Sequence, residues 1–281
     1  MNRSRPPAVA GSFYPSDGDD LRGLIDQCFH TSPLGPHGRK TISPTLIAGM
    51  VPHAGYVYSG PCAAHLFAIL HSNIHRVVLL GVNHRGKGHR AALSPAEVWE
   101  TPLGRVQVDV KLRDSIESRV DFVKTDEHSH RQEHSIEVQL PFLQQVLERF
   151  TFVPLSLSFL SLEECAELGA AVADACREES GSGTDTIVLA SSDLSHYLSP
   201  EKTDELDKIA LEKVLAMDAE GLLRVVEEKE ITMCGVLPTA VMLYAASALG
   251  AKNSRLLKQC HSGDVTPMTK VVGYASVAIE H

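Results

Sequence analysis

Residues 45–81 read TLIAGMVPHAGYVYSGPCAAHLFAILHSNIHRVVLLG, and this stretch decides the fold class. The apolar runs 45–51 and 76–81 are short enough to be buried strands. Pro61 stands at the first position of a helix predicted to begin there, where proline is well tolerated. A strand, a loop, a helix and a second strand in this length predict a βαβ unit whose two strands run parallel.

The same alternation continues along the chain. Strands are predicted at residues 151–157, 186–190, 255–261 and 271–279, and helices at 19–28, 161–179, 204–216, 218–228 and 237–249. Residues 135–149 also have a helical pattern, in which Pro141 marks a kink or a late start. We therefore predict one α/β domain over residues 1–281, with a mostly parallel central sheet flanked by helices.

Composition narrows the classes of function. The chain has 281 residues, 43% of them hydrophobic and 22% charged, and a net charge of −9. Nucleic acids and anionic membranes attract basic surfaces, so we expect neither as a partner. No apolar run would span a bilayer and residues 1–15 lack a signal-peptide core, which together predict a cytoplasmic protein. The six cysteines include no Cys-x-x-Cys motif, which favours free thiols.

Histidines follow three of the predicted strands. His53 comes just after strand 45–51, His84 just after strand 76–80, and His196 shortly after strand 186–190. Ligands of open α/β sheets bind beyond the carboxyl ends of the strands. Three histidines at equivalent strand ends therefore predict a shared polar or metal site at one edge of the sheet.

Further candidates lie outside the strand ends. Cys234 precedes a predicted helix, whose N-terminus would lower the thiol pKa, so it is a metal ligand, a nucleophile or a small buried residue. His134 and Glu137 would share a helix face, a pairing that suits proton transfer or ligand orientation, although an ordinary polar helix start is the alternative. The pair formed by His128 and His130 is expected to be solvated.

Most of these residues lie in six short sequence motifs. They are AGSFYP (10–15), VPHAGYVYSG (51–60), LLGVNH (79–84), EHSIEVQLPFL (133–143), SSDLSHY (191–197) and MCGVLPT (233–239). In this order and combination they resemble the Memo family, called AmmeMemoRadiSam system protein B in prokaryotes. The resemblance implies a fold like that of class III extradiol non-haem iron dioxygenases. It also implies a metal held by His53, His84 and Cys234, with His134, Asp193 and His196 forming a nearby polar shell.

The resemblance also carries expectations about cofactor and partners. Iron is the expected metal, with copper and zinc as alternatives. AMMECR1-like and radical-SAM proteins are implied as partners by family association. A small molecule or a peptide is expected in the cleft, to which Tyr56 and Glu137 would contribute. The resemblance does not imply a specific enzymatic reaction.

The third metal ligand sets this sequence apart from extradiol enzymes, which use two histidines and a carboxylate around Fe(II). A Cys234 thiolate is softer and oxidises readily, which weakens the case for ring cleavage. Asp193 is the alternative, either as a carboxylate ligand or as the group that holds a histidine in its metal-binding tautomer. The sequence leaves this choice open.

Three functions are compatible with these residues. The first is a metal-dependent, dioxygenase-like oxidoreductase in which His134, His196 and Asp193 manage protons. The second is a non-catalytic metal- or peptide-binding interaction protein that uses the same cleft. The third is a metal-assisted hydrolase or lyase with His134 or His196 as the base.

Overall fold

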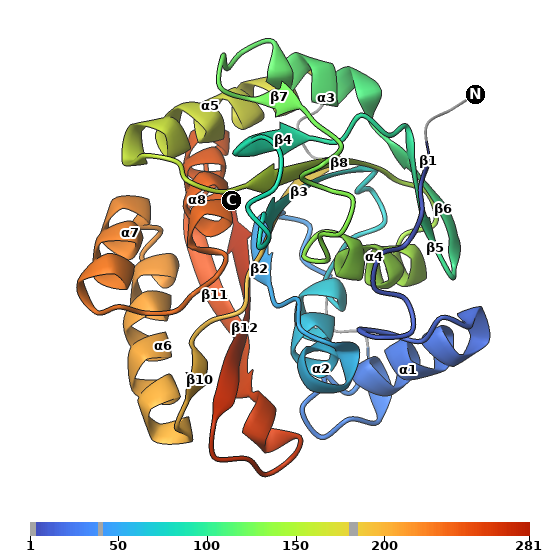
Figure 1. The fold of residues 1–281 in the computed structure, drawn as a ribbon, viewed down its shortest axis with the longest axis vertical. Coiled ribbons are helices and arrows are strands. Elements are labelled where there is room, and N and C mark those ends of the chain that lie inside the picture. The colour runs from blue at the N-terminus through green and yellow to red at the C-terminus, as the bar shows by residue number, and fades with distance from the viewer. Residues whose placement is uncertain (1–3, 39–41, 180–184) are drawn as a thin grey trace.

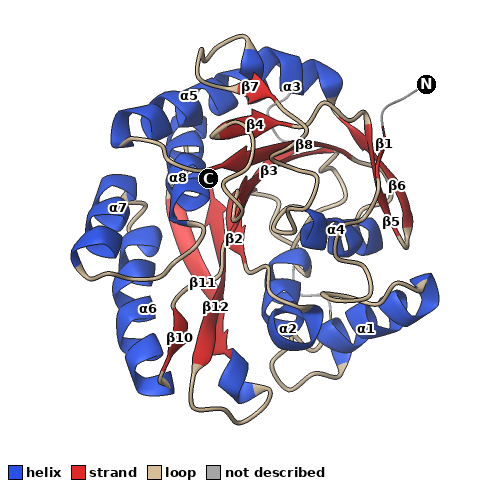
Figure 2. Cartoon of the chain, in the orientation of Figure 1, coloured by secondary structure: helices blue, strands red, loops and turns tan. Residues whose placement is uncertain are grey.

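A computed structural model describes residues 4–38, 42–179 and 185–281 and places one large sheet through the middle of the molecule (Figures 1 and 2). The strands are β1 (Ser4–Arg5), β2 (Leu46–Val51), β3 (Arg76–Val82), β4 (Ala91–Leu93), β5 (Val98–Thr101), β6 (Gly104–Val108), β7 (Lys124–Thr125), β8 (Thr151–Leu157), β9 (Thr186–Ser191), β10 (His196–Leu198), β11 (Asn253–His261) and β12 (Val271–Glu280). The strands predicted near 45–51, 76–81, 151–157, 186–190, 255–261 and 271–279 are confirmed.

The sheet is mixed, with the strand order β1-β5-β6-β8-β3-β9-β2-β12-β10. A central block, β6-β8-β3-β9-β2, is parallel, whereas β12 pairs antiparallel with β2, β10 and β11, and β5 pairs antiparallel with β6. The sheet as a whole is mixed, so the prediction of a mostly parallel sheet is wrong. Short connections join β5 to β6 and β11 to β12, and only antiparallel pairs can be closed so briefly.

Helices cover both faces of the sheet (Figure 1). They are α1 (Gly18–His30), α2 (Tyr56–Phe67), α3 (Val110–Glu117), α4 (Leu140–Val146), α5 (Leu162–Glu179), α6 (Pro200–Leu215), α7 (Ala219–Glu228) and α8 (Val236–Leu249), with 3₁₀ helices η1 (Glu137–Gln139) and η2 (Ser262–Asp264). None of the helices in the described ranges has both the length and the apolar character that crossing a bilayer requires.

Two helix starts differ from the sequence predictions. Helix α2 begins at Tyr56, so Pro61 lies inside the helix instead of at its first position. Because Pro61 has no N–H, the carbonyl of Val57 lacks its helical hydrogen bond. Val57 is exposed, so water can donate to this carbonyl instead. In the segment 135–149 the α-helix spans only Leu140–Val146, with Pro141 in its first turn, which confirms the late start.

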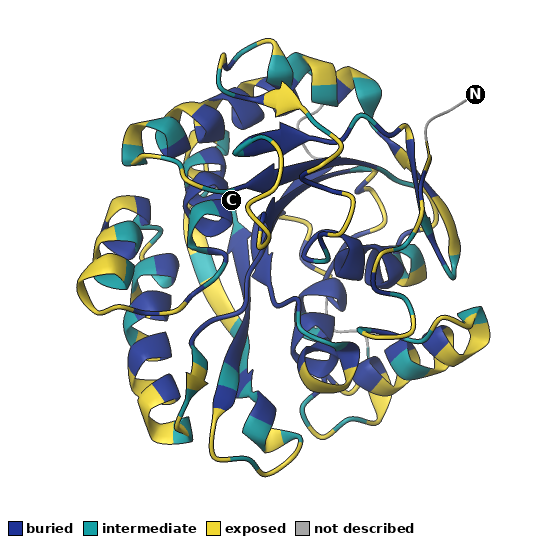
Figure 3. Cartoon of the chain, viewed as in Figure 1, coloured by how far each residue is buried: buried dark blue, intermediate teal, exposed yellow. Residues whose placement is uncertain are grey.

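Two large apolar clusters lie on opposite faces of the sheet, and a small third cluster contains Cys62, Cys260 and Tyr274. Along β3, Val77 and Leu79 pack with the core under α1, α2 and α4, whereas Val78 and Leu80 pack with the core under α5 and α8. Successive side chains of a strand point to opposite faces, so a strand covered on both sides is apolar throughout. Figure 3 shows these central strands as buried. The continuous apolar runs in the sequence therefore mark strands whose ends, and not their faces, are free to form a site.

Candidate metal centre

Neighbouring parallel strands deliver the first residues of the site. His53 follows the end of β2 and His84 follows the end of β3, and β9 lies between these strands and leads into Asp193. His134 joins them from the segment just before η1. Among the described residues, a ring nitrogen of each of His53, His84 and His134 lies within 4.8 Å of the others. The predicted meeting of histidines at one sheet edge is confirmed for His53 and His84.

The rings of His84 and His134 stack on each other, and the ring of His53 stands edge-on to both. The centroids of His84 and His134 are 4.7 Å apart with nearly parallel rings. The ring of His53 stands perpendicular to both, at 5.1 Å from His84 and 5.4 Å from His134. His53 is buried and the side chain of His84 is 29% exposed. The group therefore opens to solvent on the His84 side.

The hydrogen bonds of His53 fix its tautomer. Its Nδ1 lies 2.9 Å from Ser191 Oγ, and that hydroxyl donates its own proton to the carbonyl of Ser135. Ser191 can therefore only accept from the ring, so His53 Nδ1 carries the proton and Nε2 is a bare acceptor. Burial, followed by the charges of His134 and His84, lowers the pKa of His53 well below its usual value. His53 is thus neutral, with Nε2 available to a metal.

Glu133 orients the other two rings. Its carboxylate accepts hydrogen bonds from the backbone N–H and Nδ1 of His84, both at 2.9 Å, and from the backbone N–H of His134 at 2.8 Å. Burial alone would raise the pKa of Glu133, but the His84 hydrogen bond and the two histidine charges outweigh it and lower the pKa to about 2. A buried carboxylate on Nδ1 leaves His84 Nε2 free, as in many metal sites.

Glu137 does not have the role that its spacing from His134 predicted. Its carboxylate is fully buried and binds Arg5 Nη1 at 2.7 Å, the Tyr14 hydroxyl at 2.6 Å and the backbone of Val9 at 3.0 Å. Tyr56 is likewise buried, and its hydroxyl donates within the core. Neither residue belongs to the histidine group. The orienting carboxylate is instead Glu133, and its place next to His134 was the available signal in the sequence.

Cys234 lies beside His53. Its Sγ is 3.2 Å from His53 Nε2 and 3.6 Å from the carbonyl oxygen of Asp193. Two ligands at metal distances of about 2.1 Å for nitrogen and 2.3 Å for sulfur are separated by about 3.1–3.6 Å when their angle at the metal is between 90° and tetrahedral. The separation of this pair is compatible with one shared ion. Among the described residues, however, the group whose ligand atoms all lie within 4.8 Å of one another consists of the three histidines and does not include Cys234.

The prediction of a lowered thiol pKa at Cys234 is wrong. Burial, followed by the charge of Asp193, raises the pKa of Cys234 well above its usual value. Helix α8 begins two residues later, at Val236, and its N-terminus does not outweigh these effects. Without a metal the sulfur is a thiol, and metal binding would have to displace its proton.

Asp193 and His196 occupy distinct positions near this pair. Asp193 is buried, and its Oδ1 accepts the backbone N–H of His53 at 2.7 Å, so this oxygen positions the His53 loop. Burial raises the pKa of Asp193 to about 6. His196 is partly exposed, and its Nδ1 lies 2.9 Å from the carbonyl of Thr232. A carbonyl only accepts, so His196 Nε2 is left free for proton exchange.

The remaining candidates divide between surface and interior. His128 is exposed, as expected, and so are Arg85 and Lys87 after His84. His130 is only 1% exposed, so the expectation that it is solvated is wrong. Its Nε2 binds the carbonyl of Ala92 at 2.9 Å, and its ring packs edge-on against Trp99. Because its neighbours in the sequence are charged, the sequence did not indicate that His130 is buried.

Removing the carboxylate of Glu133 should weaken metal binding. We expect Glu133→Gln to lower the affinity for Co²⁺ or Zn²⁺ roughly 10- to 100-fold, the usual cost of losing an outer-shell partner. Chelator competition measures the affinity, and the Co²⁺ absorption bands report the changed ligand geometry. Glu127→Gln, at an exposed carboxylate, is the matched control. Equal affinities for wild type and Glu133→Gln would contradict the orienting role.

Asp207 braces the loop that carries Asp193 and His196. Its carboxylate accepts the backbone N–H of Ser195 at 2.9 Å, in a space that Gly273 leaves open by lacking a Cβ atom. Burial raises the pKa of Asp207 from 3.8 to about 6, so folding takes up a proton between these values. The associated stability is full below pH 4 and is lost as the pH rises through 6.

Asp207→Asn should remove this pH dependence. Relative to the variant, the wild-type free energy of unfolding should fall by roughly 2–3 kcal/mol between pH 4 and pH 7. Urea unfolding of both proteins across this range measures the difference. Parallel pH profiles for the two proteins would show that the carboxyl group does not titrate as described.

Comparisons with known proteins place the whole chain in one family. A family model described as Memo-like protein matches residues 5–278. A MEMO1 family protein of Methanopyrus kandleri is 40% identical over 280 residues, covering 97% of this chain and 98% of the relative. Another, from Methanococcoides burtonii, is 42% identical over 277 residues, covering 98% of this chain and all of the relative. With such coverage and identity, the chain belongs to the Memo-like protein family.

Proposed function

We propose that this protein holds one transition-metal ion between His53, His84 and Cys234 and acts as a metal-dependent, dioxygenase-like oxidoreductase. The observation that carries the proposal is the 3.2 Å separation of Cys234 Sγ from His53 Nε2. The hydrogen bond to Ser191 keeps the ring proton on Nδ1, so Nε2 has a free lone pair. His84 presents its own Nε2 for the equivalent reason, because Glu133 holds its Nδ1.

The donor set limits the metal. Two neutral imidazoles and one thiolate suit iron, copper or zinc, and of these iron and copper support oxidation chemistry. Asp193 fits less well as the third ligand, because its Oδ1 already accepts the His53 backbone N–H. When bound, the metal would supply Lewis acidity and, if redox-active, an electron-transfer centre.

The surrounding residues supply the proton chemistry in this proposal. His196 Nε2 is free and the residue is partly exposed, so it can exchange protons with water and with a substrate in the cleft. His134 stacks on His84, and burial lowers the pKa of His134 to about 4, so at neutral pH it is a proton acceptor. Glu133 stays ionised and holds both imidazoles in place.

Metal analysis of protein purified without oxygen and without added metal tests the ligand set. We expect close to one metal ion per chain in the wild type and its loss in Cys234→Ser, with His134→Gln as the comparison, because a ring nitrogen of His134 also lies in the histidine cluster. Loss of metal in His134→Gln but not in Cys234→Ser would reject Cys234 as the third ligand. The redox role fails separately if Fe(II)-loaded protein binds neither oxygen nor a catechol-like ligand in anaerobic-to-aerobic spectroscopy.

A further inference from the structure

Gln139 is a buried amide that binds two neighbours of His53. It is the last residue of η1 and is 1% exposed. Its Nε2 lies 2.9 Å from the carbonyl oxygen of Pro52 and 2.9 Å from Ser191 Oγ. Pro52 directly precedes His53 in the chain, and Ser191 is the hydroxyl that accepts the Nδ1 proton of the His53 ring. Gln139 therefore joins the end of β2 to the end of β9, on the backbone side and on the ring side of His53.

Only one arrangement of protons satisfies these hydrogen bonds. A carbonyl oxygen only accepts, so the Gln139 atom that faces Pro52 is the amide nitrogen, and its second proton goes to Ser191 Oγ. The Ser191 hydroxyl donates its own proton to the carbonyl of Ser135 at 2.6 Å and accepts from His53 Nδ1 at 2.9 Å. Ser191 Oγ thus makes the one donated and two accepted hydrogen bonds that a hydroxyl can make.

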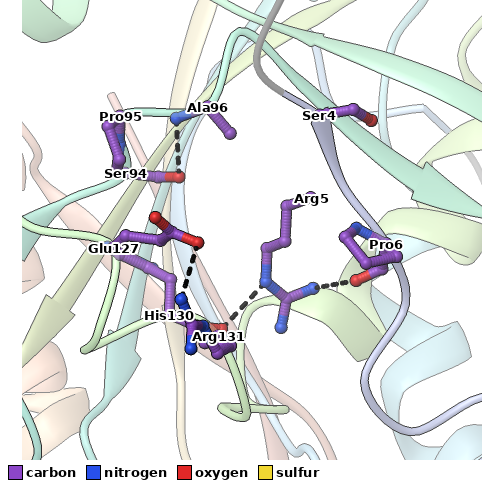
Figure 4. Close-up of a pocket in the computed structure, with 9 residues that line it drawn as sticks. All are labelled: Ser4, Arg5, Pro6, Ser94, Pro95, Ala96, Glu127, His130 and Arg131. Atoms are coloured by element: carbon purple, nitrogen blue, oxygen red, sulfur yellow. Dashed lines mark hydrogen bonds and ion pairs between the residues drawn. The ribbon is translucent and has the colours of Figure 1, made fainter.

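The segment that leads into Gln139 is itself held in place by Arg5, a wall residue of the cavity drawn in Figure 4. The Arg5 guanidinium donates from Nε to the carbonyl of His130 at 2.9 Å and from Nη2 to the carbonyl of Glu133 at 2.6 Å. Its Nη1 pairs with Glu137 at 2.7 Å. One buried cation therefore fixes this segment at three points, which gives the Gln139 amide a rigid base.

A neutral amide suits this position chemically. It supplies two protons from one nitrogen and adds no charge next to a metal centre, where a Lys or Arg side chain would repel the cation. We propose that Gln139 is a positioning residue of the metal centre, which holds the His53 imidazole through Pro52 and through Ser191. The role at the metal rests on the proposed function, in which His53 is a ligand, whereas the role on the ring does not.

Gln139→Met tests the effect on the metal. Methionine is unbranched like glutamine and of similar size, but it has no proton to donate. We expect the affinity of the full chain for Co²⁺ to fall roughly 10- to 100-fold, as for other outer-shell partners, with shifted Co²⁺ absorption bands. Chelator competition measures the affinity, and circular dichroism confirms folding. Gln145→Met, at an exposed position of α4, is the matched control and should bind as the wild type does.

NMR of the metal-free protein labelled with ¹⁵N-histidine tests the effect on the ring. In Gln139→Met the Nδ1 proton of His53 should exchange with solvent roughly tenfold faster than in the wild type, because its acceptor has lost a hydrogen bond. The His53→Ala spectrum assigns the signal. Unchanged exchange would overturn the positioning of the ring, whatever the metal result.

The metal measurement decides separately. If the wild type binds Co²⁺ and folded Gln139→Met binds it equally well, the role of Gln139 at the metal centre is overturned. If the wild type binds no metal, the proposed function fails, and the exchange of the ring proton still decides whether Gln139 positions His53. In the wild type both Nε2 protons of Gln139 should exchange as slowly as core backbone amides. Fast exchange of either one would overturn the proposal even if the variant fails to fold.

Discussion

His53→Ala should abolish metal binding while the protein remains folded. His53 Nε2 lies 3.2 Å from Cys234 Sγ; Ser191 holds the ring through Nδ1, and Asp193 holds the backbone N–H of the same residue. Loss of a ligand should exceed the roughly 10- to 100-fold cost of losing an outer-shell partner. Elemental analysis of protein purified without oxygen measures the metal content, and circular dichroism measures the fold.

The same variant should carry a stability cost of its own. Removal of the ring takes one hydrogen bond from Ser191 Oγ, which keeps its bonds with Ser135 and Gln139. It also takes one contact from Cys234 Sγ, which keeps the Asp193 carbonyl. We expect roughly 0.5–1.5 kcal/mol for each lost hydrogen bond. His128→Ala is the matched control, because His128 is exposed and should affect neither metal content nor stability. Retention of a stoichiometric metal in His53→Ala would place the metal centre elsewhere.

Glu137→Ala should be the most destabilising single change among those considered. It leaves the buried Arg5 guanidinium without its carboxylate and removes the acceptor of the Tyr14 hydroxyl. Breaking a buried ion pair costs about 3–5 kcal/mol, and for a chain of this size the midpoint of thermal unfolding should fall by roughly 10 °C. Urea unfolding followed by the fluorescence of Trp99, the single tryptophan, measures the loss.

An exposed carboxylate supplies the comparison. Glu205 pairs with Lys202 on the surface of α6, where both side chains are at least half exposed, so Glu205→Ala should cost about 0.5 kcal/mol or less. The Glu137 variant should also disturb the metal centre, because Tyr14 adjoins Phe13, whose ring lies 4.5 Å from His134. Equal stabilities for the Glu137 and Glu205 variants would show that the buried network contributes little.

The sequence predicted the parts of the site that depend on topology. Strands β2, β3 and β9 are apolar on both faces, so their positions and their common direction could be inferred, and with them the meeting of His53 and His84. The hydrogen-bond partners could not be inferred in the same way. Glu133 and Glu137 flank His134 within one short segment, and the α-helix begins only at Leu140, so spacing along an α-helix does not decide which carboxylate faces the rings.

Two other errors have the same origin in burial. Cys234 was assigned a low pKa from its place before a helix, but the desolvation of a buried thiol is larger than the effect of a helix N-terminus two residues away. His130 sits in a charged stretch of sequence and is nevertheless covered by Trp99 and Arg5. Burial of such residues is a tertiary property, and periodicity does not reveal it.

The ion pair between Arg5 and Glu137 spans 132 residues of chain, and the contact between His53 and Cys234 spans 181. During synthesis the amino-terminal segment must wait until nearly half of the protein has been made before it finds its carboxylate, and the sulfur arrives later still. In the proposed metal centre, Cys234 can therefore join His53 only after most of the chain has been made. A nascent chain that ends before Cys234 would lack one of the three proposed ligands.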